Sequence, residues 1–331
     1  MFQIAKIIPL LFLVAIPLDA KTIFKLEDPR GDDHGNGLLE YPGRTEFEKG
    51  DLDLLSLKAI EAKDGTWFVA SFARPIKQTH PGAIDELGTG LSDIARYGFY
   101  TFNIDIYIDM DGEEDSGAIA MLPGRKAELD AKNGWEKAII LTPRPNAIRS
   151  ELRQLMVKGY EQYQRDLAAE EADRREAETG EPALSEPVPS RKQLSAQIGP
   201  QIDERIFFPK LVRVRGQEVR FFVPDRFLRG PAKADWGYTV AVTGASLGQS
   251  FDFSATIGLA DETRNNLGAI PVSPGRWKDR FGGGRDDAAL QPPIVDMLLP
   301  EGETQESVLS NFDSRRERPA VVRAVVPATA D

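Results

Sequence analysis

The sequence predicts an all-β fold, an antiparallel β-sandwich that is interrupted by one inserted charged helix. Short stretches of alternating apolar and polar residues recur along the chain and are separated by turn residues. The 29 glycines and 23 prolines are typical of a protein with many turns between short strands. No regular alternation of strand and helix signals is present, which argues against a parallel, doubly wound sheet.

Residues 1–20 have the layout of a secretory signal peptide. Lys6 lies in a short basic head, an apolar run covers residues 7–16, and Ala20 is the small residue expected at a cleavage site. The apolar run is too short to span a bilayer, although an uncleaved membrane anchor is the alternative interpretation. We therefore expect residues 21–331 to form one exported domain, periplasmic or extracellular, that does not span a membrane.

The composition limits how this domain is stabilised and what it binds. The chain has no cysteine, so its hydrophobic core alone must hold the fold, and 41% hydrophobic residues make that feasible. The formal net charge of −11 argues against nucleic acid and anionic lipid as partners. It suits an exported protein that meets divalent cations.

Several strands are expected in chain order. Residues 66–72 alternate in polarity, and Trp67 in this strand is assigned to the core. Residues 102–109 place four apolar side chains on one face and Asn103, Asp105, Tyr107 and Asp109 on the other. Gly216 and Gln217 predict a hairpin between two neighbouring strands. The remaining strands are expected at 137–141, 211–215, 218–223, 237–242 and 249–257.

The segment from about 148 to 206 interrupts the β pattern. Apolar residues recur at helical spacing between 152 and 167, and residues 170–178 are almost all charge and alanine. Three prolines, at 182, 187 and 189, then exclude regular structure. We expect one long helix that begins against the sandwich and projects into solvent, followed by a flexible link. The helix at 149–178 is a candidate docking surface for a protein partner; a solvated insertion without a role is the alternative.

A cluster of aspartates directly follows the export signal. It contains Asp28, Asp32, Asp33, Asp51 and Asp53, separated by glycines and a proline that exclude a buried strand or a helix. Like charges held together on a tight loop need a cation to neutralise them. Carboxylate ligands alone on a compliant loop suit Ca²⁺ better than a transition metal. The sequence thus predicts a calcium site here; a solvated acidic turn with nothing bound is the alternative.

A second acidic stretch, residues 109–115, resembles a calcium loop only superficially. Its glycine stands at the fourth position instead of the sixth, and Ala120 occupies the place of the closing glutamate of an EF-hand. We expect a turn at the end of a strand. Asp109 is nevertheless a candidate ligand, because strand ends gather at the rims of a sandwich.

Few signals for catalysis are present, and we expect a protein that is not an enzyme. Only two histidines are present, His34 and His80, and there is no P-loop or cluster of Cys and His residues. A glycoside hydrolase that uses two of the 52 acidic residues is an alternative, but so many acids make any chosen pair uninformative.

Aromatic side chains offer one route to binding sugars, whose C–H faces stack on flat rings. Trp135, Trp236 and Trp277 lie beside glycines or charged residues, near strand starts or turns. We treat all three as candidate carbohydrate-binding residues. Packing in the core is the alternative for each.

Several motifs together resemble a known family. The acidic loop at 28–37, with Tyr41-Pro42 and residues 50–54, resembles the opening of the glucodextranase-type C-terminal domain. Further matches follow in order as far as a closing segment, from about residue 23 to 325 and apart from the insertion. They lie at 106–109, 134–135, 223–225, 236–238, 281–284 and 294–298, and at Pro300, Gln305, Val308 and Leu309.

The resemblance implies an antiparallel sandwich, immunoglobulin-like or jelly-roll-like, related to DOMON-like domains and to family-nine carbohydrate-binding modules. It implies a non-catalytic module, accessory to glycan-degrading enzymes, whose partner is a glycan or a cell-envelope polysaccharide. Bound calcium is typical of this group, which supports Asp28, Asp32, Asp33, Asp51 and Asp53 as ligands and, less directly, Asp109. Asn36 departs from the family, which usually has proline there. A haem-binding electron-transfer module, using Met110, Met121 or His80, and a structural envelope protein are the alternatives.

Overall fold

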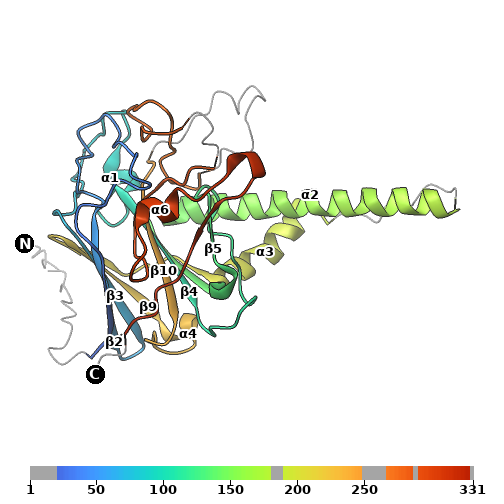
Figure 1. Ribbon diagram of the computed structural model, residues 1–331, viewed down its shortest axis with the longest axis horizontal. Helices are drawn as coiled ribbons and strands as arrows, with labels where there is room; N and C mark the ends of the chain where they lie inside the picture. The colour runs from blue at the N-terminus through green and yellow to red at the C-terminus, as the bar shows by residue number, and fades with distance from the viewer. Residues whose placement is uncertain (1–20, 180–188, 248–265, 286–289, 329–331) are drawn as a thin grey trace, which may run out of the picture.

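The computed structural model describes residues 21–179, 189–247, 266–285 and 290–328. Within these residues the protein is mostly β, with two five-stranded sheets that face each other (Figure 1). The predicted signal peptide and the strand expected at 249–257 lie outside the described residues.

The first sheet has the strand order β1-β2-β3-β9-β8, and every neighbouring pair in it is antiparallel. Its strands are β1 (Thr22–Glu27), β2 (Leu54–Ala62), β3 (Gly65–Phe72), β8 (Val212–Arg215) and β9 (Glu218–Pro224). The predicted hairpin is confirmed, because Arg215 of β8 pairs with Glu218 of β9 across Gly216. Gly216 has φ +60°, a left-handed conformation that favours glycine in this tight turn.

The second sheet has the order β11-β10-β4-β6-β7 and is antiparallel except for the pair β6–β7. Its strands are β4 (Phe102–Asp109), β6 (Lys137–Leu141), β7 (Ile206–Phe207), β10 (Gly237–Gly244) and β11 (Ile294–Met297). A separate parallel pair joins β5 (Ala127–Leu129) to β12 (Ala320–Val322). The shorter helices are α1 (Leu91–Ile94), α4 (Asp225–Leu228), α6 (Gln305–Leu309), η1 (Ala131–Asn133) and η3 (Ser314–Arg316).

The main core lies between the two sheets and is rich in aromatic rings. Phe72 of β3 packs against Phe102 of β4, with ring centroids 4.6 Å apart. At another point Phe24 of β1 contacts Tyr238 of β10 at the same separation. These contacts join one sheet to the other, and they confirm the predicted sandwich. Trp67 is also buried, against Phe222 of β9 on the opposite face of the first sheet.

The second sheet is buried on its outer face as well. There Tyr107 and Ile140 pack against residues of the inserted helices, which include Ile148 and Leu194. All residues of β4 are consequently buried, including the polar face that the sequence predicts. Asp105 on this face receives a hydrogen bond of 2.6 Å from the buried Arg125 side chain.

The insertion contains two helices instead of the single helix predicted. Helix α2 (Pro145–Thr179) begins against the second sheet and projects far beyond it, as expected (Figure 1). The predicted flexible link is wrong over residues 191–205, which form α3 (Arg191–Arg205). Ser190 and Gln193 form a capping box that starts α3 directly after Pro189, and the buried Ile198 fixes the helix on the core. Pro182 and Pro187 lie outside the described residues.

The projecting part of α2 presents an apolar stripe to solvent. Its exposed members are Met156, Tyr160, Tyr163 and Leu167. No helix in the described part of the chain is long and apolar enough to cross a membrane.

Candidate functional site

The acidic loop between β1 and β2 is tied to both sheets. At its start the Asp28 amide donates to Leu55 O of β2 at 3.0 Å, and further on the Gly35 amide donates to Val295 O of β11 at 2.8 Å. The Gln305 side chain at the start of α6 donates to the carbonyls of Asp32, at 2.6 Å, and Gly35, at 3.1 Å. The loop therefore crosses from the edge of the first sheet to the edge of the second.

Three carboxylates converge at this crossing: Asp28 and Asp32 of the loop and Asp296 of β11. Each offers an oxygen, and these oxygens all lie within 4.8 Å of one another. Oδ2 of Asp28 and Oδ1 of Asp32 are buried and have no hydrogen-bond partner. We call these three residues the aspartate trio. Buried oxygens that lack a donor are what a hard cation would coordinate.

The electrostatics of the trio are unfavourable without a cation. Burial is the main cause that raises the pKa of Asp28 to about 8, and the neighbouring Asp32 charge adds to it. Burial also raises the pKa of Asp296 well above its ordinary value, and the Asp28 charge is the next cause. The pKa of Asp32 is raised, chiefly by burial. A divalent ion at this point would oppose these pKa shifts, because its positive charge would stabilise the ionised carboxylates.

Asp53 borders the trio and directly precedes β2. Its Oδ2 accepts a hydrogen bond from the Gly31 amide at 2.8 Å, whereas its Oδ1 is buried without a partner. Burial raises the pKa of Asp53 to about 6, and the Asp53 charge in turn raises the pKa values of Asp28 and Asp296. Asp53 is thus a candidate fourth ligand.

Two other aspartates from the predicted set are held by groups of the protein. Oδ2 of Asp33 accepts hydrogen bonds from the Tyr41 hydroxyl and, at 2.6 Å, from the Gly50 amide. Asp51 forms ion pairs with Arg74 at 3.3 Å and Lys77 at 2.8 Å. Oδ1 of Asp33 is buried without a partner, as in the trio, but of the predicted ligands it is Asp28 and Asp32 that the structure places together with Asp296.

Asp109 belongs to a second acidic group. Its oxygens lie within 4.8 Å of those of Asp111 and Glu136, at the end of β4 and just before β6. Oδ1 of Asp109 accepts from the Gly112 amide at 2.8 Å, and Oε2 of Glu136 accepts from the Met110 amide at 2.7 Å. These bonds close the strand-end turn expected from the sequence, and Asp109 is not a member of the trio.

Asp296 is the site residue that sequence reasoning missed. It is fully buried, and its carboxylate accepts hydrogen bonds from the amides of Leu54, at 2.6 Å, and Met297, at 2.8 Å. One signal was present, since Asp296 is the only charged residue in the apolar run at 294–298. Its position beside Asp28 follows from the packing of β11 near the start of the chain, which no local pattern reveals.

The three candidate tryptophans lie in different surroundings. Trp135 is 6% exposed, donates from Nε1 to Ala120 O at 2.9 Å, and is covered by Arg205 at 4.7 Å from the ring centroid. Trp236 is 5% exposed and packs in the main core. Trp277, by contrast, is 64% exposed. Because Trp135 and Trp236 are buried, neither has a free ring face on which a sugar could stack. Trp277 is therefore the remaining candidate for stacking on a sugar.

Comparison with family models gives the chain its family. The family described as the C-terminal binding module, SLH-like, of glucodextranase matches residues 23–325, so the chain belongs to that family. This confirms the resemblance found in the sequence motifs. The matched family is a binding module and not a catalytic domain. Comparison with curated proteins gave no significant match.

Proposed function

From its membership of the glucodextranase C-terminal binding-module family, we propose that the protein is an exported, non-catalytic module that binds carbohydrate or cell-envelope polymer. The match over residues 23–325 is the observation that carries this proposal. In this role the protein holds a glycan, or acts as an accessory to enzymes that degrade it. The sandwich supplies a rigid frame on which binding loops are displayed.

We further propose that the module is stabilised by Ca²⁺. The aspartate trio would hold the ion, and Asp53 borders it as a fourth ligand. Two features of the described residues fit calcium: all the donors are carboxylate oxygens, and several are buried without a partner. The role of the ion would be structural: its positive charge would neutralise the carboxylates. Because the trio joins the acidic loop to β11, bound calcium would resist separation of the two sheets and couple binding to folding.

The proposed glycan contact is Trp277. Its loop is fixed by backbone hydrogen bonds, among them Gly43 N to Trp277 O at 2.9 Å and Ser273 N to Phe281 O at 2.9 Å. An exposed ring on a fixed loop costs little conformational entropy when a sugar stacks on it. We therefore expect Trp277 to contribute more to glycan binding than the buried tryptophans.

Isothermal titration of the full chain with neutral glucans, dextran and a β-glucan, tests the binding proposal. We expect saturable binding to at least one of them, weakened about tenfold or more by Trp277→Ala. Tyr163→Ala on α2 is the matched control, since Tyr163 is also an exposed aromatic residue, at 57%. Equal affinity of the wild type and Trp277→Ala would remove Trp277 from the site. Failure to bind any saccharide, neutral or acidic, would contradict the proposed function.

A further inference from the structure

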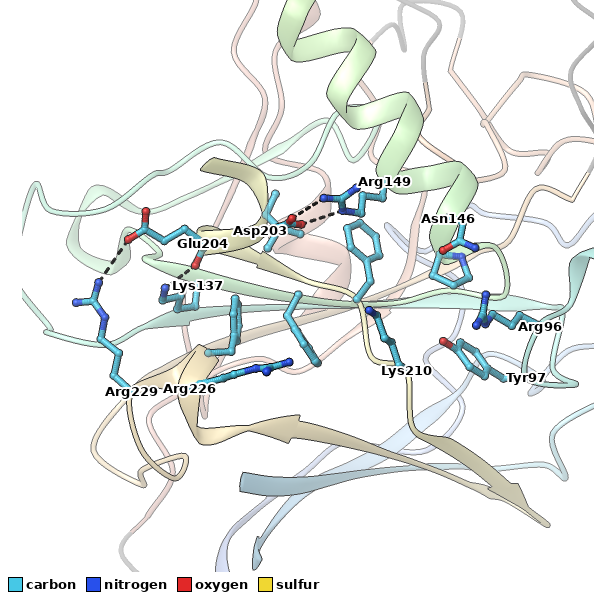
Figure 2. Close-up of a pocket in the computed structure, with 15 residues that line it drawn as sticks. Arg96, Tyr97, Lys137, Asn146, Arg149, Asp203, Glu204, Lys210, Arg226 and Arg229 are labelled. Atoms are coloured by element: carbon cyan, nitrogen blue, oxygen red, sulfur yellow. Dashed lines mark hydrogen bonds and ion pairs between the residues drawn. The ribbon is translucent and has the colours of Figure 1, made fainter. Parts of the chain in front are cut away.

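A cavity of about 740 Å³ lies between the second sheet and the inserted helices (Figure 2). Its walls come from segments far apart in the sequence: the residues before β4, the start of β6, the first turns of α2, the end of α3, the segment after β7, and α4. Its size falls within the range of small-molecule sites, about 300–1,000 Å³. Its positively charged lining residues, labelled in Figure 2, are Arg96, Lys137, Arg149, Lys210, Arg226 and Arg229.

The charge of this pocket is opposite to that of the whole protein. Six of its lining residues are lysine or arginine and two are acidic, whereas the chain has a formal net charge of −11. Positive side chains that surround one concave site raise the local concentration of anions. A negatively charged ligand would be repelled by most of the molecule and attracted here.

The two acids satisfy only part of this positive charge. Arg149 pairs with Asp203 at 2.8 and 2.5 Å, and Arg229 lies 3.6 Å from Glu204. Lys137 donates to the main-chain carbonyl of Glu204 at 2.5 Å and forms no ion pair within the described residues.

The other three cations, Arg96, Lys210 and Arg226, form no ion pair within the described part of the chain. Figure 2 shows them around the same space, each on a different segment of the chain. All three residues are exposed, so they can meet a ligand without disturbing the core.

Lys137 is the buried member of the six cations that line the pocket. It is 6% exposed, and its Nζ lies 5.0 Å from the centroid of the Phe227 ring. Burial is the main cause that lowers the pKa of Lys137, and the positive charge of Arg229 is the next. An anionic ligand would relieve the repulsion between these two cations.

Aromatic rings supply the apolar part of the lining. Phe207 of β7 is partly exposed and is backed by Phe227 of α4, a core residue that is 7% exposed; their ring centroids lie 5.1 Å apart. The Tyr97 ring is held in place because its hydroxyl donates to Pro209 O at 2.6 Å. Rings of this kind pack against the C–H faces of a sugar, while guanidinium groups bind carboxylate or phosphate oxygens in pairs. A small inorganic anion would leave most of such a cavity unfilled.

We propose that this pocket binds an acidic saccharide, a sugar that carries a carboxylate or phosphate group. The inference rests on the proposed carbohydrate-binding function and specifies a ligand class for it. Arg96, Lys210 and Arg226 receive the acidic group, and the partly exposed rings of Tyr97 and Phe207 receive the body of the sugar. The inserted helices gain a role, because α2 and α3 supply Arg149, Asp203 and Glu204 to the walls.

Calorimetric titration of the full chain with two pairs of probes tests this. The carboxylate pair is trigalacturonic acid and neutral galactotriose, and the phosphate pair is glucose 6-phosphate and glucose; inorganic phosphate is the fifth probe. We expect one acidic sugar or both to bind at least tenfold more tightly than the neutral counterpart and than inorganic phosphate. Which pair shows the difference identifies the acidic group.

The double variant Lys210→Gln, Arg226→Gln should bind the acidic sugar about tenfold more weakly than the wild type, or weaker still. Its matched control is Lys63→Gln, Arg215→Gln, which removes the same charge from exposed residues outside the pocket; this control should keep the wild-type affinity. Acidic sugars that bind no better than neutral ones, or an equal loss in both double variants, would overturn the inference. Phosphate binding as tightly as the acidic sugars would also overturn it, because the sugar would then contribute nothing.

The test of the acidic-saccharide pocket can fail independently of the test of the proposed function. If dextran binds through Trp277 and the acidic sugars do not bind, the inference fails and the proposed function stands. If trigalacturonic acid or glucose 6-phosphate occupies the pocket while dextran does not bind, the inference stands and the Trp277 surface is lost.

Discussion

The carboxylates of the trio are buried, and apolar side chains at the same positions would destabilise the folded state less. Asp296 is fully buried and the pKa of Asp28 is about 8, so ionised side chains here are destabilising unless a cation accompanies them. Calcium that bound only the folded state at the trio would stabilise the protein, and its binding free energy would include the relief of this repulsion. The consequences can be measured at single residues.

Asp32→Asn tests the trio with the smallest change. The variant keeps the size of the side chain and removes one charge, so calcium should stabilise it less than the wild type. A free calcium concentration 100-fold above the Kd raises wild-type stability by about 2.7 kcal/mol, and most of this gain should be lost. Without calcium the variant should be at least as stable as the wild type, because a repulsive charge is gone.

The measurement is thermal unfolding in excess chelator and in millimolar calcium. Asp111→Asn is the control, because Asp111 belongs to the second acidic group near Asp109. That control should keep the full calcium-dependent rise in melting temperature. The reverse pattern, with the rise lost in Asp111→Asn and kept in Asp32→Asn, would assign the ion to the second group.

The raised pKa values also predict how stability depends on pH. In chelator the folded protein holds protons on Asp28 and Asp296 at pH values where the unfolded chain, with a pKa of about 4, has released them. Because the folded state binds more protons, stability falls as pH rises from about 5 to 8. Calcium replaces these protons, so the stabilisation by calcium should grow over the same range. Melting curves at several pH values check this; parallel curves with and without calcium would contradict it.

At the scale of elements, the periodicity of the sequence predicted structures that depend on neighbouring residues. It missed structures that depend on contacts between distant segments. The β8–β9 hairpin follows from two alternating stretches around Gly216, and both are confirmed. Helix α3 was missed because prolines precede it and Pro200 lies inside it, which local rules treat as breakers. Its buried residues Leu194, Ile198 and Ile202 pack on the second core, so tertiary contacts decide the outcome.

This packing makes a prediction about the insertion. Leu194→Ala removes a fully buried side chain from α3 and should lower the free energy of unfolding by about 2–4 kcal/mol. Leu167→Ala on α2 is the same chemical change at a residue that is 41% exposed, and should cost less than about 0.5 kcal/mol. Urea denaturation of both variants measures the difference. Equal effects would mean that α3 does not pack on the core in solution.

For the whole molecule, the candidate site joins segments that are far apart in the sequence. Asp28 follows β1 near the amino end, whereas Asp296 lies in β11 and Gln305 begins α6 near the carboxyl end. The sequence predicted that Asp28 and Asp32 lie in one acidic loop. The structure brings these two side chains together. It gave no indication that Asp51 would pair with Lys77, or that Asp109 would form a separate group, because those contacts depend on how distant segments pack.

The central claim is that a calcium ion held by the trio fastens the acidic loop of the first sheet to the edge of the second. Anomalous diffraction from crystals of the full chain grown in millimolar calcium tests it most directly. We predict an anomalous peak between the carboxylates of Asp28, Asp32 and Asp296, with metal–oxygen distances of about 2.3–2.6 Å. A map without that peak, with these side chains turned apart into water, would contradict the account.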